Sequence, residues 1–277
     1  MAAWLKTWLA GESQQLRWLA FEDYARQVFA NNHPAWHTEA MRYAAGLADA
    51  NKVLGSQVVS FDFGAVFATH AKLAAECEGV ERISALLDDA ALKAFCADAI
   101  GALAHQLSAK VDVVLQLPSP SGLLISLGED AANIDFDMLD DAATALAELL
   151  RGFAELAIAG LVIAFTDNAV DLGDEGEACE ACEVLQGLAG HYDWFFALRL
   201  ESAELSEGLE DLEADIRLLP TIDAVELDAQ NGSTGGGLNS AFWNGNGLPS
   251  VERICLYGDV PLDLDPKVVL ERVAALF

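Results

Sequence analysis

The chain has 277 residues, with 15 Lys and Arg against 44 Asp and Glu, which gives a formal net charge of −29. A charge of this sign repels nucleic acid, anionic membranes and polyanionic substrates, so we expect none of them as partners. Hydrophobic residues make up 53% of the chain, which excludes disordered and fibrous proteins. No apolar stretch is long enough to span a membrane, no signal-peptide pattern is present, and five Cys do not indicate a disulfide framework. We expect a soluble, cytoplasmic, acidic globular protein, whose charge could equally be an adaptation to salt.

Short β-rich runs alternate with helical patterns along the chain. Each run is rich in β-branched or aromatic residues and is bounded by Gly, Pro, Asp or Asn. The expected strands are 58–63, 111–117, 161–166, 194–200, 224–227 and 253–257, and the helical patterns are 81–109, 137–157, 175–190, 204–214 and 264–276. Apolar strands separated by helices predict βα units with a parallel sheet.

The ends of the expected strands favour a barrel over an open doubly wound sheet. Residues 63–67, which follow the first expected strand, lack the Gly-x-Gly-x-x-Gly turn of a dinucleotide-binding sheet. Polar residues follow the expected strands, and in a barrel the carboxyl ends of the strands carry the site. These residues are Asp62, Ser119, Asp167, Glu201, Asp228 and Asp259. We therefore predict an α/β fold, a (β/α)8 TIM-barrel-like domain over residues 51–277, with residues 1–50 as a helical segment packed on it.

Five segments resemble, in order, the superfamily of uroporphyrinogen decarboxylase and cobalamin-independent methionine synthase. They are 61–63, 113–124, 156–167, 222–228 and 256–269. In residues 113–124, VVLQLPSPSGLL, a strand leads into a Ser-Pro turn like that of the superfamily's second strand. Taken together, the likeness covers about residues 40–277 and implies a β/α barrel.

Departures from the superfamily bear on the function that it implies. Its zinc-dependent methyltransferases carry His-x-Cys where residues 197–202 read ALRLES, so we expect the metal site to be lost. The decarboxylases bind an octacarboxylate through an Arg-x-x-x-Arg arrangement, which Arg17, Arg26 and Arg42 do not reproduce. The chain ends before the superfamily's last strands. The barrel is therefore expected to be truncated or distorted, unless residues 1–50 or a second subunit, as in a homodimer, close it.

Asp62 is the leading candidate for a catalytic group. The resemblance implies a position at the barrel centre, where the matching aspartate of the decarboxylases stabilises positive charge that develops on a pyrrole. Phe61, Phe63 and Phe67 flank it in the sequence, and a desolvated carboxyl has a raised pKa or needs a partner. The alternative is a strand-end Asp that caps the next helix.

Arg199 is the cation of the run 194–202. Inside a barrel it must pair with a carboxylate or an anionic ligand, because an unpaired buried charge is very costly. Strand alternation could instead place it outward with Glu201.

Arg199 and Tyr257 are expected to orient a substrate. The expected substrate-binding residues are Ser119, Ser121, Asp167, Glu201, Asp228, Asp259 and Trp243. Trp243 lies in the Gly- and Asn-rich stretch 231–247, which is expected to form a loop over the barrel mouth.

Cys179 and Cys182 have a spacing found in metal and redox sites, but they lie within a helical pattern. A structural zinc needs four ligands, and no second pair is evident. The flanking Glu177, Glu180 and Glu183 disfavour a reactive thiolate. We expect these Cys to be small buried hydrophobes, and we expect neither a metal nor a cofactor.

Two functions are compatible with these features. The first is a metal-independent lyase of the decarboxylase type that acts on a small or tetrapyrrole-like molecule, with Asp62 as its electrostatic or acid–base centre. The alternative is a methyltransferase-related or non-catalytic relative that has lost the zinc site and binds a small molecule or a partner. Convergence of Asp62, Arg199 and Asp228 on one pocket would favour an enzyme.

Overall fold

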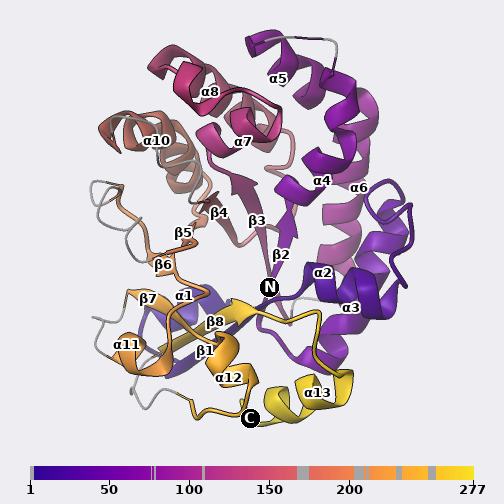
Figure 1. Ribbon diagram of the computed structural model, residues 1–277, viewed down its shortest axis with the longest axis vertical. Helices are drawn as coiled ribbons and strands as arrows, with labels where there is room; N and C mark the ends of the chain where they lie inside the picture. Colours follow the sequence, from indigo (N-terminus) through magenta and orange to yellow (C-terminus); the bar gives the residue numbers. More distant parts are fainter. Residues whose placement is uncertain are drawn as a thin grey trace.

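Eight parallel strands form a nearly closed barrel surrounded by helices, which confirms the predicted (β/α)8 TIM-barrel-like fold (Figure 1). The computed structural model describes residues 3–75, 77, 79–107, 110–166, 175–202, 209, 212–228, 233–248 and 254–277. The strands are β1 (Gln15–Ala20), β2 (Val58–Asp62), β3 (Asp112–Pro118), β4 (Gly160–Phe165), β5 (Phe195–Leu200), β6 (Ile216–Leu218), β7 (Thr234–Gly237) and β8 (Ile254–Asp259).

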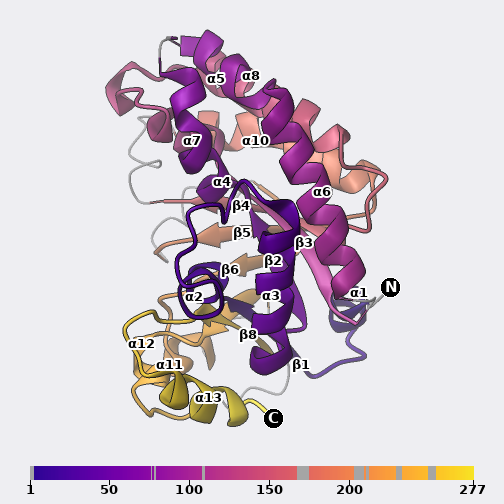
Figure 2. The same cartoon turned by 90° about the vertical axis from the view of Figure 1, so that its right-hand side faces the viewer.

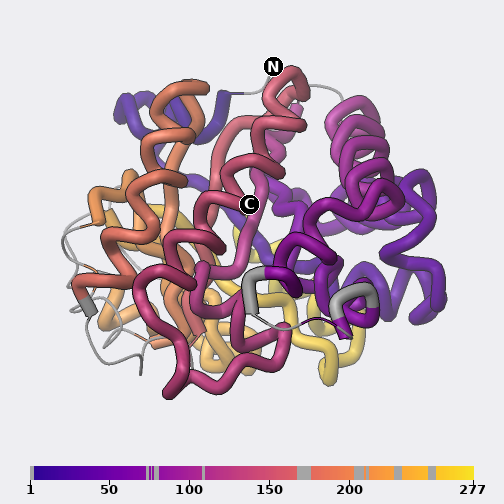
Figure 3. Tube along the Cα trace, turned by 90° about the horizontal axis from the view of Figure 1, so that it is seen from above, coloured from indigo at the N-terminus to yellow at the C-terminus, as the bar shows by residue number. Residues whose placement is uncertain are grey.

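Helices cover the outside of the barrel. They include α1 (Trp4–Leu9), α2 (Glu22–Tyr24), α3 (Ala40–Leu54), α4 (Phe63–His70), α5 (Gly79–Leu87), α6 (Ala90–Gln106), α7 (Pro120–Ser126), α8 (Phe136–Arg151), α10 (Glu175–His191), α11 (Ala224–Asp228), α12 (Ser240–Trp243) and α13 (Pro266–Ala274). α3 and α6 lie side by side on the flank that carries β2 and β3 (Figure 2). From above, the helical tubes follow one another around the barrel, with α8 packed on α10 (Figure 3). Each helix among the described residues is too short or too polar to serve as a transmembrane segment.

The barrel interior is a packed apolar cluster, because alternate side chains of each strand point inward. Its members are Leu5, Trp8, Leu16, Trp18, Val58, Val114, Val162, Phe195, Ala197, Ile216, Leu218, Cys255 and Tyr257. The intervening residues, such as Phe61 and Leu115, pack against the helices instead. Leu5 and Trp8 of α1 fill the amino-terminal end of the barrel, where the Leu5 amide donates to Asp112 Oδ2 at 2.8 Å. With this end filled, the interior is left accessible at the carboxyl ends of the strands.

The seam of the barrel lies between β1 and β2, the two ends of the hydrogen-bonded strand order. Two buried polar residues just before β2 bridge it. Gln57 N donates to Arg17 O at 2.8 Å, and its side-chain Oε1 accepts from Arg17 N at 2.8 Å. Ser56 Oγ accepts from Leu19 N at 3.0 Å. Side chains therefore satisfy backbone groups of β1 that a regular strand pairing would otherwise use.

Residues 1–50 differ from the helical segment that the sequence analysis expected, because they contain β1. This strand pairs in parallel with β8, from Gln15 opposite Ile254 to Ala20 opposite Asp259. Leu16 and Trp18 face the barrel interior. The chain itself thus supplies all eight strands. Of the alternatives left open, residues 1–50 complete the barrel, and it is not truncated.

Three further elements differ from expectation in the C-terminal half. The expected strand 224–227 is helix α11, which Asp223 begins by accepting from the amides of Val225 and Glu226, both at 2.8 Å. The short strands β6 and β7 were not anticipated. β7 lies inside the Gly-rich stretch expected as a loop, and a Cβ on Gly236 would lie 2.1 Å from Ile222 Cγ2. Glycine here permits close strand packing and does not mark a flexible loop.

Candidate functional site

A cavity of about 380 Å³ opens at the carboxyl ends of β1, β2, β3, β5 and β8. Pockets that hold small molecules commonly have volumes of roughly 300–1,000 Å³. Its lining combines apolar side chains with a group of polar ones: Ser60, Glu22, Asp23, Asp62, Gln116, Arg199 and Asp259. The active sites of barrels of this kind lie at this face, so we take this mouth cavity as the candidate site.

Strand alternation places the polar group there. Gln116, Arg199 and Asp259 each lie two residues beyond an inward-facing residue of the packed interior, namely Val114, Ala197 and Tyr257. Asp62 lies four residues beyond Val58 on β2. Because side chains of a strand alternate between two faces, all four point into the barrel above its apolar core.

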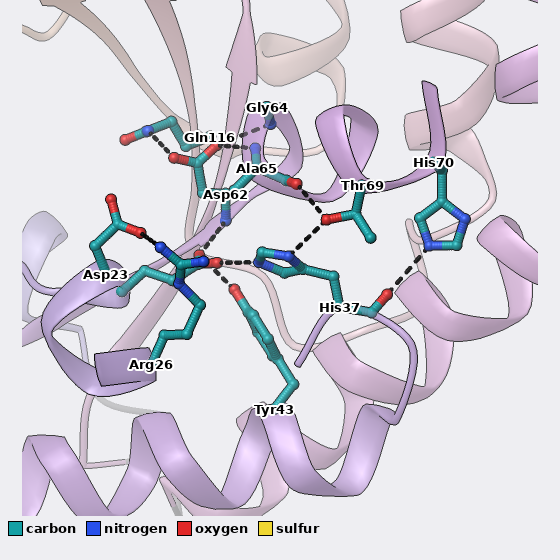
Figure 4. Close-up of polar contacts among 11 residues, drawn as sticks. Asp23, Arg26, His37, Tyr43, Asp62, Gly64, Ala65, Thr69, His70 and Gln116 are labelled. Carbon is teal, nitrogen blue, oxygen red and sulfur yellow. Dashed lines mark hydrogen bonds and ion pairs between the residues drawn. The ribbon is translucent and has the colours of Figure 1, made fainter. Parts of the chain in front are cut away.

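Asp62 combines the two roles that the sequence analysis set against each other. It caps α4, since its Oδ1 accepts from Gly64 N at 2.8 Å and from Ala65 N at 3.4 Å (Figure 4). It also lines the cavity, where its Oδ2 accepts from Gln116 Nε2 at 2.9 Å. Burial, followed by the nearby charge of Glu22, raises the pKa of Asp62 to about 7, against the opposing effect of these amides and of Arg199.

Glu22 is a second carboxyl group on the same wall, and the sequence analysis missed it. Its Oε1 lies 2.8 Å from His37 Nε2, and its Oε2 accepts from Tyr43 OH at 2.6 Å. The backbone amide of Asp62 lies 3.4 Å from the same Oε2. Glu22 follows the end of β1 by two residues, so recognition of β1 would have indicated it as a strand-end acid. Tyr43 is fully buried, and burial together with the charge of Glu22 raises its pKa.

Arg199 points inward, and carboxylates and a hydroxyl hold it from several sides. Nε donates to Tyr257 OH at 3.0 Å, Nη2 to Asp259 Oδ2 at 3.1 Å, and Nη1 to Glu201 Oε1 at 3.3 Å. The alternative of an outward-facing Arg199 is thus wrong. Tyr257 is buried beneath it, and burial raises the pKa of this phenol. The guanidinium is thereby fixed as a positive charge in the cavity wall.

The other expected substrate-binding residues are placed differently. Ser119 and Ser121 are fully buried at the start of α7, where Ser119 Oγ accepts from Gly122 N at 3.0 Å and lies 3.1 Å from Ser121 Oγ. These hydroxyls serve the helix start and do not line the mouth cavity. Trp243 lines a neighbouring cavity of about 250 Å³ that shares Asp259 with the mouth cavity. Asp167 and the side chain of Asp228 lie outside the described residues.

The zinc site that the resemblance implies does not fit the residues at the end of β5. The inward side chain there is Arg199, a permanent cation already bound by Asp259 and Glu201, and a guanidinium is not a metal ligand. Across the part of the chain that the structure describes, no group of three His, Cys, Asp or Glu side chains could hold a metal ion.

Cys179 and Cys182 are buried in α10, as expected, and burial raises the pKa of Cys182.

Comparison with known proteins gives a fold but no family. No protein-family model and no curated protein matches the sequence. Among solved structures, a methyltransferase from Methanosarcina mazei matches with a TM-score of 0.60 and 13% identity, over 98% of this chain and 96% of that chain. At this identity the likeness concerns the barrel alone. It is consistent with the superfamily resemblance, which no family match confirms.

Proposed function

We propose that this protein is a methyltransferase-related barrel that binds a small molecule in its mouth cavity and uses Asp62 as the acid–base group. The observation that carries the proposal is a carboxyl group with a pKa of about 7 in the wall of a cavity of small-molecule size. Such a group both accepts and donates protons near neutral pH. The structural likeness to a methyltransferase favours this alternative over the decarboxylase reading.

In methyl transfer to a thiol or amine, the acceptor atom forms a bond to the methyl carbon while the bond between that carbon and the donor breaks. The donor, a methylated corrinoid or folate, leaves with the electron pair of the broken bond. The acceptor also loses its proton, and the contacts of Gln116 and Gly64 with the two oxygens of Asp62 support this carboxylate as the base that takes it. Arg199 adds a fixed positive charge across the cavity, which stabilises negative charge on a bound ligand. This arrangement supplies a base in a barrel whose β5 end offers no zinc ligand.

The lining also restricts the class of ligand. Glu22, Asp23, Asp62 and Asp259 face the cavity, against Arg199 as the cation among its lining residues. A polycarboxylate such as uroporphyrinogen would meet net repulsion there. We therefore expect a small ligand that is neutral or cationic, or that carries at most one anionic group for Arg199.

A decarboxylase-type lyase is the second candidate, and one specific observation favours it. Loss of carbon dioxide leaves a carbanion that must be protonated, and the raised pKa of Asp62 in the cavity wall supports its neutral form as the donor of that proton. The same residue thus serves both candidates. The fate of the substrate, a transferred methyl group or released carbon dioxide, distinguishes them.

A ligand screen tests the proposal. Thiols, amines, corrinoids, folates, tetrapyrroles and small carboxylates would be screened by thermal shift, and hits measured by calorimetry. We expect a thiol or amine hit whose affinity falls about tenfold or more in Asp62→Asn, about 1.4 kcal/mol. Asp193→Asn is the matched control, because Asp193 is exposed and pairs with Lys6 away from the cavity. Mass spectrometry of the acceptor would then detect the added methyl group.

Equal affinity of the hits for the wild type and Asp62→Asn would contradict the mouth cavity as the site. Carbon dioxide release without methyl transfer would replace the first candidate with the second.

A further inference from the structure

His37 lies behind the wall of the mouth cavity and connects Glu22 of α2 to Thr69 of α4. Its Nε2 is 2.8 Å from Glu22 Oε1. Its Nδ1 is 2.8 Å from Thr69 Oγ1 (Figure 4). Both members of the His37–Glu22 pair are largely buried, with side chains 10% and 13% exposed. A contact of this kind in a protected position is stronger than one on the surface.

The directions of the surrounding hydrogen bonds restrict where the protons lie. Thr69 donates its single hydroxyl proton to Ala65 O at 3.1 Å, so its oxygen must accept from His37 Nδ1. Tyr43 OH donates to Glu22 Oε2, which leaves Oε1 for His37. The Nε2–Oε1 contact needs one further proton. On Glu22 this proton makes both groups neutral; on His37 it makes His37 an imidazolium and Glu22 a carboxylate.

Asp62 is a carboxyl neighbour of this pair, and its own backbone amide lies 3.4 Å from Glu22 Oε2. The charge of Glu22 opposes ionisation of the Asp62 carboxyl. A positive charge on His37 offsets that of Glu22, so the two charges act on Asp62 in opposite directions. The charge of His37 therefore affects the ionisation of Asp62 in the cavity, although His37 and Asp62 are not in contact.

We propose that His37 is a positioning residue that carries a positive charge, balances Glu22, and so controls whether Asp62 gives up its proton in the mouth cavity. This rests on the proposed role of Asp62 as the acid–base group. The charged and titratable groups that face Asp62 or His37 are Glu22 from α2, Tyr43 from α3, His70 from α4, Arg199 from β5, and Tyr257 and Asp259 from β8. Of these, Glu22 and Tyr43 face both Asp62 and His37. Burial raises the pKa of Tyr43 well above its ordinary value, so Glu22 is the one of the two that carries a charge.

The charge of His37 acts on Asp62 through Glu22. Without the positive charge on His37, Glu22 is unbalanced, and its negative charge holds the proton on Asp62 more firmly.

Titration of the whole chain without ligand tests this inference. Carbon-13 NMR of labelled carboxyl groups follows Asp62, identified by its absence in Asp62→Asn, and nitrogen-15 NMR reports the protons on the His37 ring. In the wild type we expect a proton on both ring nitrogens of His37. His37→Gln keeps a donor for Glu22 but removes the charge, so the Asp62 midpoint should rise by about one pH unit, a tenfold change in proton affinity. His70→Gln is the matched control, because His70 contacts only the backbone oxygen of His37 among these groups.

An unchanged Asp62 midpoint in His37→Gln, or a neutral His37 ring in the wild type, would overturn the inference. If His37→Gln fails to fold, Thr69→Val serves instead, since it removes the acceptor for Nδ1–H and leaves both charged side chains in place. It should raise the midpoint in the same direction by less. A wild-type Asp62 that titrates far from neutral pH would instead contradict the proposed function, so the two failures are distinguishable.

Discussion

The backbone amide of Asp62 lies 3.4 Å from Glu22 Oε2, so two carboxyl groups from neighbouring elements share one wall of the mouth cavity. The two carboxyl groups have different hydrogen-bond partners. Glu22 contacts the phenol of Tyr43 and the imidazole of His37. Asp62 accepts from two backbone amides at the start of α4 and from the side-chain amide of Gln116. Pairs of acids in contrasting environments are typical of acid–base sites, because their protons are released at different pH values.

The first prediction concerns stability against pH. The pKa of Asp62 is about 7 in the folded protein, above its ordinary 3.8, so between these values the folded state binds more protons than the unfolded state. Stability is therefore lost as pH rises through this window. Asp62→Asn keeps the helix cap and should be more stable than the wild type by roughly 2–4 kcal/mol at about pH 8, with the gain vanishing towards about pH 4.

Urea denaturation across this pH range measures the effect. The matched control, Asp193→Asn, alters an exposed carboxylate and should show no such pH-dependent gain. A wild type that is more stable than Asp62→Asn at alkaline pH would contradict the raised pKa.

The second prediction concerns Arg199. Its positive charge favours the ionised form of Asp62, so Arg199→Met should raise the pH at which Asp62 loses its proton, by about one unit. It also leaves Asp259 without its partner, and the affinity for any anionic group of the ligand should fall. Carboxyl NMR and calorimetry measure the two effects. Arg151→Met, at the end of α8, is the control, and a downward shift of Asp62 in Arg199→Met would refute the electrostatic argument.

The third prediction concerns the seam between β1 and β2. Gln57→Ala removes the acceptor of the Arg17 amide and should cost about 1–3 kcal/mol, because a buried donor is left unpaired. Ser56→Ala removes the acceptor of the Leu19 amide, with a similar cost. Amide exchange in β1 should accelerate more than in β4, which has strands on both sides. Gln186→Ala is the control, since its amide donates to an exposed backbone oxygen, and equal losses in all three variants would argue against a side-chain seam.

How much of the site could be predicted depended on how local each signal was. Asp62, Arg199 and Asp259 were found because each lies in or just after a short apolar run, which is visible within ten residues of sequence. Gln116 carried a signal that was overlooked: it is a polar residue two positions after Val114, on the same face of a strand. Glu22, His37 and Tyr43 were missed because their contact depends on how α2, α3 and the segment between them fold together.

β1 itself could not be recognised from its composition. Its six residues, QLRWLA, include Gln15 and Arg17 on the outward face, so the segment lacks the continuous apolar run of a strand covered on both sides. Tertiary contacts compensate, since the Arg17 guanidinium lies 4.1 Å from the centre of the Phe277 ring. No local sequence pattern predicts a cation–π contact between residues near the two ends of the chain. The same holds for the pairing with β8, which joins residues more than 200 positions apart.

β7 was missed for a related reason, and this supplies the last prediction. The run TGGG was expected as a loop, yet its glycines are required by close packing: a Cβ on Gly236 would lie 2.1 Å from Ile222 Cγ2 and 2.9 Å from Leu219 O. Gly236→Ala should therefore destabilise the barrel by about 1–3 kcal/mol, because neither the backbone oxygen nor the buried Ile222 can move far.

Gly187→Ala in α10 is the matched control. A Cβ there meets nothing within 4 Å, so the change should stabilise the protein by about 0.5–1 kcal/mol through helix propensity. Thermal denaturation compares the two. If β7 were a flexible loop, Gly236→Ala would be neutral or slightly stabilising as well, because alanine reduces the freedom of the unfolded chain. Opposite signs in the two variants are thus the result expected if Gly236 lets β7 pack closely against Leu219 and Ile222, which follow β6.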